Sequence, residues 1–364
     1  MHWMVCAALF CVIASAPVSV LVYRKLRQAR VAAKLKVESV RGIVEERFVC
    51  IGGIEQWISI RGEDRNNPVL LLIHGGPGSC YSIFTPHLRS WEKQFTVVQW
   101  DQRGAGRTLK MAGFGGSGEI SFQQLRNDAI DVAEYLRAHL QKDRIFLLAS
   151  SIGSTFGLQV ARCRPDMFYA YIGTDQNAGM VRGQEENHRQ LIDRLRRLGM
   201  TRGIKAVERI GTNPLHWTPR DFKTVAQWTM KSDPPGFHRT MKLLKDAIWY
   251  APGWTLGDIR VFVKGMSFSL EQLLPEIARY DAWAEGTCFE CPFFIFQGED
   301  DVLTRTAQAQ ALFADIKAPV KRMELISNAA HFAAFLEPEE FLKKMLTYVR
   351  PLAYMSTAEV VNEP

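Results

Sequence analysis

The sequence predicts an α/β fold in which a mostly parallel sheet is flanked by helices and interrupted by a helical insertion. Continuous apolar runs such as "PVLLLIHG" and "FTVVQWDQRG" end in turn residues, which is typical of strands buried on both faces. Segments with helical periodicity alternate with such runs on both sides of residues 180–286, where no buried-strand run occurs. The alternation is that of βαβ units, and its interruption predicts an inserted helical segment.

The elements can be assigned in chain order. "ERFVCIGGIEQWISIRG" predicts two strands around a Gly-Gly turn, and the two apolar runs named above come next. Ser121 is a plausible N-cap for a helix over "SFQQLRNDAIDVAEYLRAHLQ". Later strands are expected at "RIFLLAS", "AYIGTDQ", "CPFFIFQG" and "KRMELIS", and later helices at "STFGLQVARCR", "TRTAQAQALFADI" and "EPEEFLKKMLTYV".

These assignments divide the chain into five parts. The insertion suits a cap over a site formed at the strand ends, and the parallel sheet is expected on both sides of it. The expected parts are a hydrophobic N-terminus with a basic flank (1–36), the first part of the core (37–179), the helical cap (180–286), the second part of the core (287–353) and a tail (354–364).

The N-terminal segment carries its own signal. Residues 3–23 form an uncharged stretch that is long enough for a helix to span a bilayer. Arg24 and Lys25 follow directly. The positive-inside rule then predicts a membrane anchor with the folded body in the cytoplasm. Two alternatives are a secretory signal cleaved after Ala14-Ser15-Ala16 and a helix docked on the protein's own surface.

Composition excludes several classes of protein. The net charge of +7 is concentrated between residues 24 and 36, so it does not indicate a nucleic-acid-binding surface. Seven scattered cysteines do not form a disulfide framework. Cys288 and Cys291 form a CxxC pair with no second pair or histidine cluster to complete a metal site, so we expect no metal.

A serine stands where a buried strand meets a helix, within Ala149-Ser150-Ser151-Ile152-Gly153. The pattern is close to G-x-S-x-G, in which a sharp strand-to-helix turn exposes the nucleophile's Oγ at the helix N-terminus. Ser151, not Ser150, has a glycine two residues further on, so we predict Ser151 as the nucleophile. Alanine at position 149 is a mild departure because its side chain is still small.

A serine hydroxyl needs a base to activate it, and the base needs an acid to orient it. In the architecture that uses this serine turn, the acid and then the histidine follow the serine along the chain. Glu299-Asp300-Asp301 comes directly after one expected strand, and His331 comes after the next. We predict His331 as the base and Asp301 as the acid, with Asp300 as the alternative acid.

The segment "HGGPG" at residues 74–78 ends a core strand and suits an oxyanion hole. Attack on an acyl carbon places negative charge on the carbonyl oxygen, which preorganised N–H groups stabilise. One donor is expected from Ile152, the residue after the nucleophile, and the other from this loop. We assign the second donor to Gly76, with Gly75 as the alternative.

"HGGPG", "WDQRGAGRT" at residues 100–108, the serine turn, Asp301 and His331 together resemble the proline iminopeptidase family of α/β-hydrolases. The resemblance covers residues 45–353 and implies the α/β-hydrolase fold with an inserted helical cap. It is weak over 180–286, where "APGWTLGD" replaces the Trp-Glu stretch of the family's caps. Members that cleave N-terminal proline hold the substrate's ammonium with cap carboxylates, a role that Glu185 or Glu186 could take here. The turn at Asp101 and Arg103 is expected to be structural.

The expected function is that of a serine hydrolase that forms an acyl-enzyme and needs no metal or organic cofactor. By resemblance the substrate is a peptide or amide with a free N-terminal residue, as for a proline iminopeptidase-like aminopeptidase. The alternatives are an esterase or lactonase acting on an apolar small molecule, and a non-catalytic protein that binds a ligand in the same cleft. The sequence does not indicate an oligomeric state.

Overall fold

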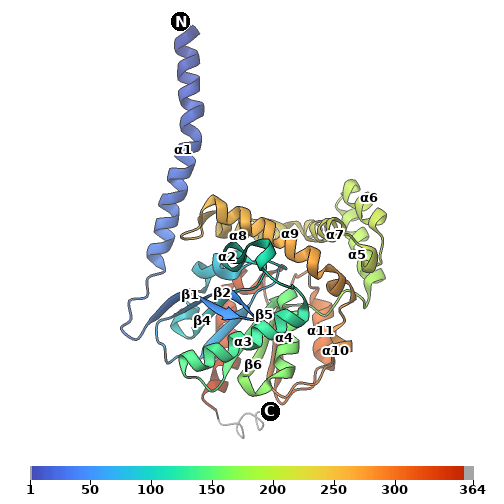
Figure 1. Cartoon of the computed structure of the whole chain (residues 1–364). Helices are drawn as coiled ribbons and strands as arrows, with labels where there is room; N and C mark the ends of the chain where they lie inside the picture. Colours follow the sequence, from blue (N-terminus) through green and yellow to red (C-terminus); the bar gives the residue numbers. More distant parts are fainter. Residues whose placement is uncertain (1, 356–364) are drawn as a thin grey trace.

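The computed structural model describes residues 2–355, with side chains from residue 18 onward, and its centre is a single eight-stranded sheet (Figure 1). The strand order is β1-β2-β4-β3-β5-β6-β7-β8, in which β1–β2 and β2–β4 are antiparallel and all later pairs are parallel. The strands are β1 (Ile43–Ile51), β2 (Ile54–Gly62), β3 (Val69–Ile73), β4 (Thr96–Asp101), β5 (Ile145–Ser151), β6 (Phe168–Gln176), β7 (Phe293–Gly298) and β8 (Lys321–Ile326).

The central strands are buried on both faces, as their continuous apolar runs predict. Alternate residues of β3 enter different cores: Leu71 and Ile73 pack on one side of the sheet, and Leu70 and Leu72 on the other. All five residues of β3 are 0–1% exposed. A polar residue in such a strand would face a core whichever way it pointed, which explains the absence of polar alternation.

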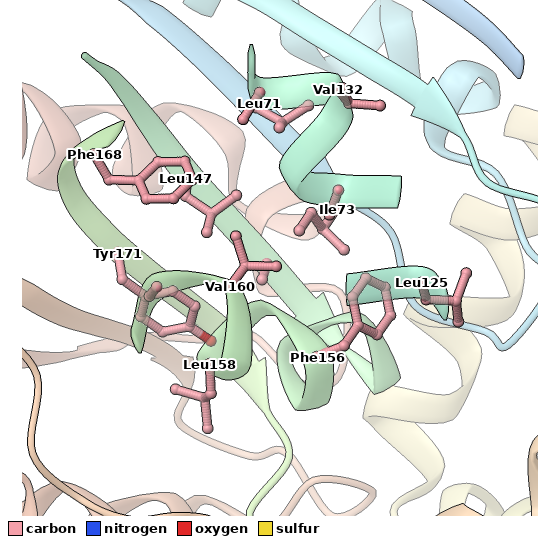
Figure 2. Packing of buried hydrophobic residues seen from close by; sticks show 14 of the residues in the cluster. Leu71, Ile73, Leu125, Val132, Leu147, Phe156, Leu158, Val160, Phe168 and Tyr171 are labelled. Atoms are coloured by element: carbon pink, nitrogen blue, oxygen red, sulfur yellow. The ribbon is translucent and has the colours of Figure 1, made fainter. Parts of the chain in front are cut away.

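Helices cover both faces of the sheet. Figure 2 shows the first core, where Leu71 and Leu147 of the sheet pack with Val132 of α3 and Phe156 of α4. Across the sheet the second core contains an aromatic group that includes Phe84, stacked on Phe335 with ring centroids 4.2 Å apart. The helices of the core are α2 (Gly106–Gly116), α3 (Phe122–Leu140), α4 (Ile152–Cys163), α11 (Thr306–Asp315), α12 (Ala333–Leu336) and α13 (Pro338–Lys344), with a 3₁₀ turn at Tyr81–Leu88.

The expected insertion lies between β6 and β7 and is helical. In Figure 1 its helices α5 to α9 lie above the sheet, with α8 and α9 between α1 and the α5–α7 group, whereas α10 lies beside α11. Complete capping boxes begin α7 and α9, at Thr218 with Asp221 and at Thr255 with Asp258, which fixes where both helices start. The helices of the insertion are α5 (Gln184–Arg197), α6 (Thr201–Ile210), α7 (Pro219–Lys231), α8 (Pro234–Tyr250), α9 (Leu256–Arg279) and α10 (Ala282–Glu285).

The N-terminal helix α1 (His2–Lys34) differs from its expected role. Within the part of the chain that the structure describes, no helix combines the length and apolar character that crossing a membrane requires. The predicted anchor over residues 3–23 is therefore wrong, and the cytoplasmic placement deduced from it loses its basis.

The basic flank of α1 has a structural role instead. Arg24 and Gln28 are only 2% and 5% exposed. Arg24 donates hydrogen bonds to the carbonyl oxygens of Trp249 and Trp254, both at 2.9 Å. Gln28 donates to the carbonyls of Ala251 and Trp254 at 2.8 and 2.9 Å. These side chains satisfy the carbonyls of the turn between α8 and α9, so this half of α1 is docked on the insertion.

Replacing Arg24 should loosen this docking. Arg24→Met keeps an apolar stem but leaves two carbonyl groups without their charged donor, which costs about 1–3 kcal/mol. We expect amide hydrogen exchange in residues 18–34 to speed up roughly tenfold or more, since 1.4 kcal/mol corresponds to a factor of ten. Arg30, exposed on the same helix, provides the control. Equal exchange in Arg24→Met and Arg30→Met would contradict the docking role.

Candidate active site

Ser151 lies at the junction of β5 and α4 in a backbone conformation that side chains rarely adopt, with φ 55° and ψ −130°. Such a conformation costs on the order of 1–3 kcal/mol and persists only where its surroundings hold it. Gly153 permits the sharp turn at Ser151, because it lets the chain pass close to His74. A Cβ at residue 153 would lie 2.4 Å from the carbonyl oxygen of His74. Ala149 fits in place of the first glycine of the pattern because it faces Gly157, whose missing side chain leaves the room.

The two adjacent serines have different environments. Ser150 is 1% exposed, accepts a hydrogen bond from the Tyr81 hydroxyl at 2.7 Å and donates to Asp175 Oδ2 at 2.9 Å. Ser151 lines a large cavity, and its Oγ lies 3.2 Å from His331 Nε2. The structure thus brings Ser151, and not Ser150, to the predicted base.

The predicted acid and base are in contact. His331 Nδ1 lies 2.9 Å from Asp301 Oδ2. The other oxygen, Oδ1, accepts the backbone N–H groups of Leu303 and Thr304 at 2.8 and 3.0 Å, which fixes the carboxylate. Asp300, the alternative acid, is exposed, and its backbone N–H donates to the Ala329 carbonyl at 3.0 Å. The geometry is an unbroken series from Asp301 through His331 to Ser151.

The loop at residues 74–78 packs against the nucleophile. Gly76, with φ 129°, and Ile152 both line the cavity beside Ser151. Gly75 lies behind them, where an added Cβ would be 2.6 Å from that of Ser151. Gly76 and Ile152 thus lie in the cavity wall next to Ser151, as the expected oxyanion donors must, and Gly75 packs against the serine turn.

His74 holds this loop in place. It is buried, and burial lowers its pKa to about 4, so it is neutral. Its Nδ1 donates to the Gly75 carbonyl at 2.9 Å, and its Nε2 accepts the backbone N–H of Gln102 at 3.2 Å.

Arg103, the residue after Gln102, is buried and donates to Asp128 Oδ1 at 2.8 Å. These contacts fit the structural role expected for the "DQRG" turn.

Asp175 is a residue that the sequence analysis did not single out. It lies at the end of β6 and is fully buried. Its Oδ1 accepts the backbone N–H groups of Phe332 and Ala333 at 3.0 and 3.2 Å, and its Oδ2 accepts the Ser150 hydroxyl. The available signal was "GTDQ", a carboxylate at the end of an expected buried strand, at the same sheet edge as the other predicted residues.

Two carboxylates act on His331. Burial alone lowers the pKa of His331, but the charges of Asp301 and Asp175 and the hydrogen bond to Asp301 outweigh it and raise the pKa to about 9. Burial raises the pKa of Asp175 above its usual range, because the charge of His331 and the hydrogen bonds that the carboxylate accepts offset burial and the charge of Asp301 only in part. The three hydrogen bonds that Asp175 accepts all favour its ionised form.

Among the described residues, Asp175, Asp301 and His331 also form the one group with the composition of a metal site. Both ring nitrogens of His331 and both oxygens of each carboxylate are already in hydrogen bonds. A metal would have to displace these partners, so the arrangement suits proton transfer better than metal binding.

The cavity in front of Ser151 has a volume of about 590 Å³ and lies between the strand ends and the helices of the insertion. Its wall is mostly apolar, with Leu191, Phe222, Met266 and Leu270 among its residues. Among the described residues that line it there is no Asp or Glu. A wall of this kind favours an apolar substrate body with few polar contacts.

The predicted ammonium-binding glutamates lie elsewhere. Both belong to the first turn of α5, but the residues of α5 that face the cavity are others, such as Asn187 and Leu191. Glu185 is exposed, and Glu186 forms an ion pair with Arg189 on the surface. Neither glutamate lines the cavity, so the geometry does not support the assignment of Glu185 and Glu186 to the substrate site.

Comparisons with known proteins agree with this geometry. Residues 70–344 match the model of the alpha/beta hydrolase family. The chain is 28% identical over 319 residues to the probable aminopeptidase YbaC of Bacillus subtilis, covering 85% of this chain and 98% of the relative. The chain therefore belongs to the α/β-hydrolase family, and within it the chain is proline iminopeptidase-like.

Two solved structures share the fold. A proline iminopeptidase-related protein from Thermus thermophilus superimposes with a TM-score of 0.57 at 19% identity, covering 85% of this chain and 99% of that one. A membrane phospholipase A described as a bacterial virulence factor does so with a TM-score of 0.59 at 16% identity, covering 98% of this chain and 100% of that one. At these identities the likeness concerns the fold.

The choice between the two aspartates can be tested. Asp301→Asn should keep His331 in place but favour the wrong tautomer, and the comparable change in a well-studied serine protease lowers kcat about ten-thousandfold. Asp300→Asn should change kcat by less than about threefold, because its side chain is exposed and a surface substitution of this kind has little effect. The measurement is kcat for an activated ester with both variants. Reversed effects would assign the acid role to Asp300.

The role of Asp175 predicts a change in pH dependence. A base must be unprotonated to accept a proton. We therefore expect kcat/KM to rise with pH, with its midpoint at the His331 pKa of about 9. Asp175→Asn removes a negative charge that stabilises the imidazolium, so the His331 pKa should fall and the rising limb should move to lower pH. Its amide oxygen can still accept the two backbone N–H groups.

A pH profile of kcat/KM for a neutral ester measures this shift, with Asp300→Asn as the control for a carboxylate lost outside the network. A profile that keeps its midpoint in Asp175→Asn, or moves to higher pH, would show that Asp175 does not act on His331 through its charge.

Proposed function

We propose that this protein is a serine hydrolase that cleaves a carboxylic ester or amide through an acyl-enzyme on Ser151. The observation that carries the proposal is the hydrogen-bonded series Asp301–His331–Ser151, which ends in a large cavity beside Gly76 and Ile152. These are the groups that acyl transfer needs: a nucleophile, a base, an orienting acid and donors for the developing oxyanion.

In this mechanism His331 Nε2 takes the Ser151 proton as Oγ attacks the carbonyl carbon of the substrate. The N–H groups of Ile152 and Gly76 stabilise the negative charge on the carbonyl oxygen. His331 then gives its proton to the leaving alcohol or amine, and the acyl group stays on Ser151. Water, deprotonated by His331, attacks the acyl-enzyme, and the acid product leaves as the proton returns to Ser151. Asp301 holds the ring and stabilises its charged form throughout.

Two substrate classes have support. The names of the Bacillus subtilis relative and the Thermus thermophilus structure favour a peptide or amide with a free amino terminus. The cavity wall favours an ester with a neutral or anionic apolar body, because no described carboxylate on it is available to pair with an ammonium. On the geometry of the cavity we place the ester first and the aminopeptidase second.

The nucleophile is tested with a fluorophosphonate probe. Ser151→Ala should lose labelling and nearly all ester turnover, by a factor of roughly a million in kcat. Ser150→Ala should still be labelled, because its hydroxyl is turned away toward Asp175. Circular dichroism checks that both variants are folded. Labelling that persists in Ser151→Ala would refute the proposed nucleophile.

The substrate class is tested with a panel of matched leaving groups. We expect a higher kcat/KM for the 4-nitrophenyl ester of hexanoate than for the 4-nitroanilides of proline and alanine after each is normalised to its rate of hydroxide-catalysed hydrolysis. A clear preference for the prolyl anilide would instead support the aminopeptidase.

A further inference from the structure

The cavity in front of Ser151 contains cationic groups that the proposed chemistry does not use. Four lysine and arginine residues line it, and among the described lining residues there is no Asp or Glu. Lys223 and Lys245 are exposed, so water solvates their charge. Arg194 and Arg305 are partly buried and face an otherwise largely apolar wall. These two arginines need a physical explanation.

Arg305 belongs to the same loop as the catalytic acid. Thr304, the residue before it, donates to Asp301 Oδ2 at 2.7 Å, so the loop that fixes the acid also fixes the start of the Arg305 side chain. Its Nη1 donates to Gln190 Oε1 of α5 at 2.9 Å. Its Nε is buried and has no hydrogen-bond partner among the described residues. A buried N–H of a charged group without an acceptor is costly, so a missing acceptor is indicated here.

Arg194 approaches from the insertion. It lies on α5, one turn beyond Gln190, and its Nε donates to the Ser232 hydroxyl at 3.0 Å. Both arginines line the same cavity, and burial and then the charge of Arg194 lower the pKa of Arg305. Burial and the charge of Arg197 lower the pKa of Arg194 as well. The negative charge of Asp233, which lies beyond ion-pair distance, raises that pKa and offsets part of the shift.

We propose that Arg194 and Arg305 form a binding subsite for an oxyanion group, a carboxylate or a phosphate, that the substrate carries away from its scissile carbonyl. This inference rests on the proposed function for its catalytic part. Guanidinium groups match carboxylate and phosphate oxygens with paired N–H donors, and a ligand oxyanion would both occupy the unpaired donors and remove the repulsion between the arginines. The wall between this subsite and Ser151 would hold the apolar part of the substrate.

A merely structural role for Arg305 is the competing explanation, since its bond to Gln190 joins the core to the insertion. The two roles differ in what they predict. A structural residue affects all substrates alike, whereas a subsite residue affects the charged substrate specifically. The ratio of two activities therefore separates them, whatever the overall loss.

The experiment compares mono-4-nitrophenyl adipate with its neutral methyl ester, which differ only at the distant end. The native protein should prefer the charged ester in kcat/KM. In Arg305→Met and Arg194→Met the ratio of charged to neutral kcat/KM should fall roughly ten- to a hundredfold each, the range expected for a charge-assisted hydrogen bond. Arg305→Lys keeps the positive charge but loses the paired N–H donors of the guanidinium group. Its ratio of charged to neutral kcat/KM should lie between those of the native protein and Arg305→Met.

Arg196→Met is the matched control. Arg196 lies on the same helix, is exposed, and pairs with Asp193 and Glu208 outside the cavity. Arg196→Met removes the same unit of charge as the cavity variants. If the preference for the charged ester comes from the subsite and not from general electrostatic attraction, the ratio of charged to neutral kcat/KM should stay within about twofold of the native value. A comparable fall in the control, or an unchanged ratio in both cavity variants, would overturn the proposal.

A second arm separates this inference from the proposed function and distinguishes the sources of the oxyanion. In the catalytically inactive Ser151→Ala protein, calorimetry should show that monomethyl adipate and methyl 6-phosphonooxyhexanoate, each with one anionic end, bind more tightly than the neutral dimethyl adipate, and that Arg305→Met removes the difference. The tighter of the two anions identifies carboxylate or phosphate as the natural group. If no ester is turned over but the anions bind in this way, the subsite stands and the proposed function fails. If esters are turned over and no anion binds selectively, only the subsite fails.

Discussion

The site depends on one buried carboxylate that joins three parts of the sheet edge. Asp175, at the end of β6, accepts a hydrogen bond from the residue before the nucleophile and two more from the backbone that follows the base. Parallel strands bring their carboxyl ends to one edge, but they do not set the spacing of the loops that leave it. Asp175 supplies that spacing between Ser151 and His331, and Asp301 can then orient a ring that is already in place.

Much of this could be predicted from the sequence because the signals were local. Each core strand is a short apolar run between turn residues, and Ser151, Asp301 and His331 each follow such a run directly. The choice of Ser151 over Ser150 followed from the position of Gly153. The structure gives the reason, since a side chain at residue 153 would collide with the His74 carbonyl.

The rest depended on contacts between distant residues. Glu185 and Glu186 are acidic residues on the first turn of a helix, and only the packing of α5 decides which of its sides meets the cavity. The charge-free run before Arg24 suggested an anchor. The sequence cannot show that Arg24 and Gln28 meet the carbonyls of a turn some 225 residues later in the chain. Asp175 was missed because "GTDQ" shows a carboxylate at a strand end but not whether the loops around it bury that carboxylate.

The docking of α1 also has a consequence for the substrate cavity. Lys245 and Ile248 of α8 line the cavity on one side and the groove beside α1 on the other. Helix α8 is thus a wall shared by the cavity and the groove. Arg24 and Gln28 donate hydrogen bonds to the turn that follows α8. A change in α1 that shifts α8 would therefore also shift a wall of the substrate cavity. Selection on substrate preference can then act on residues near the N-terminus that never touch the substrate.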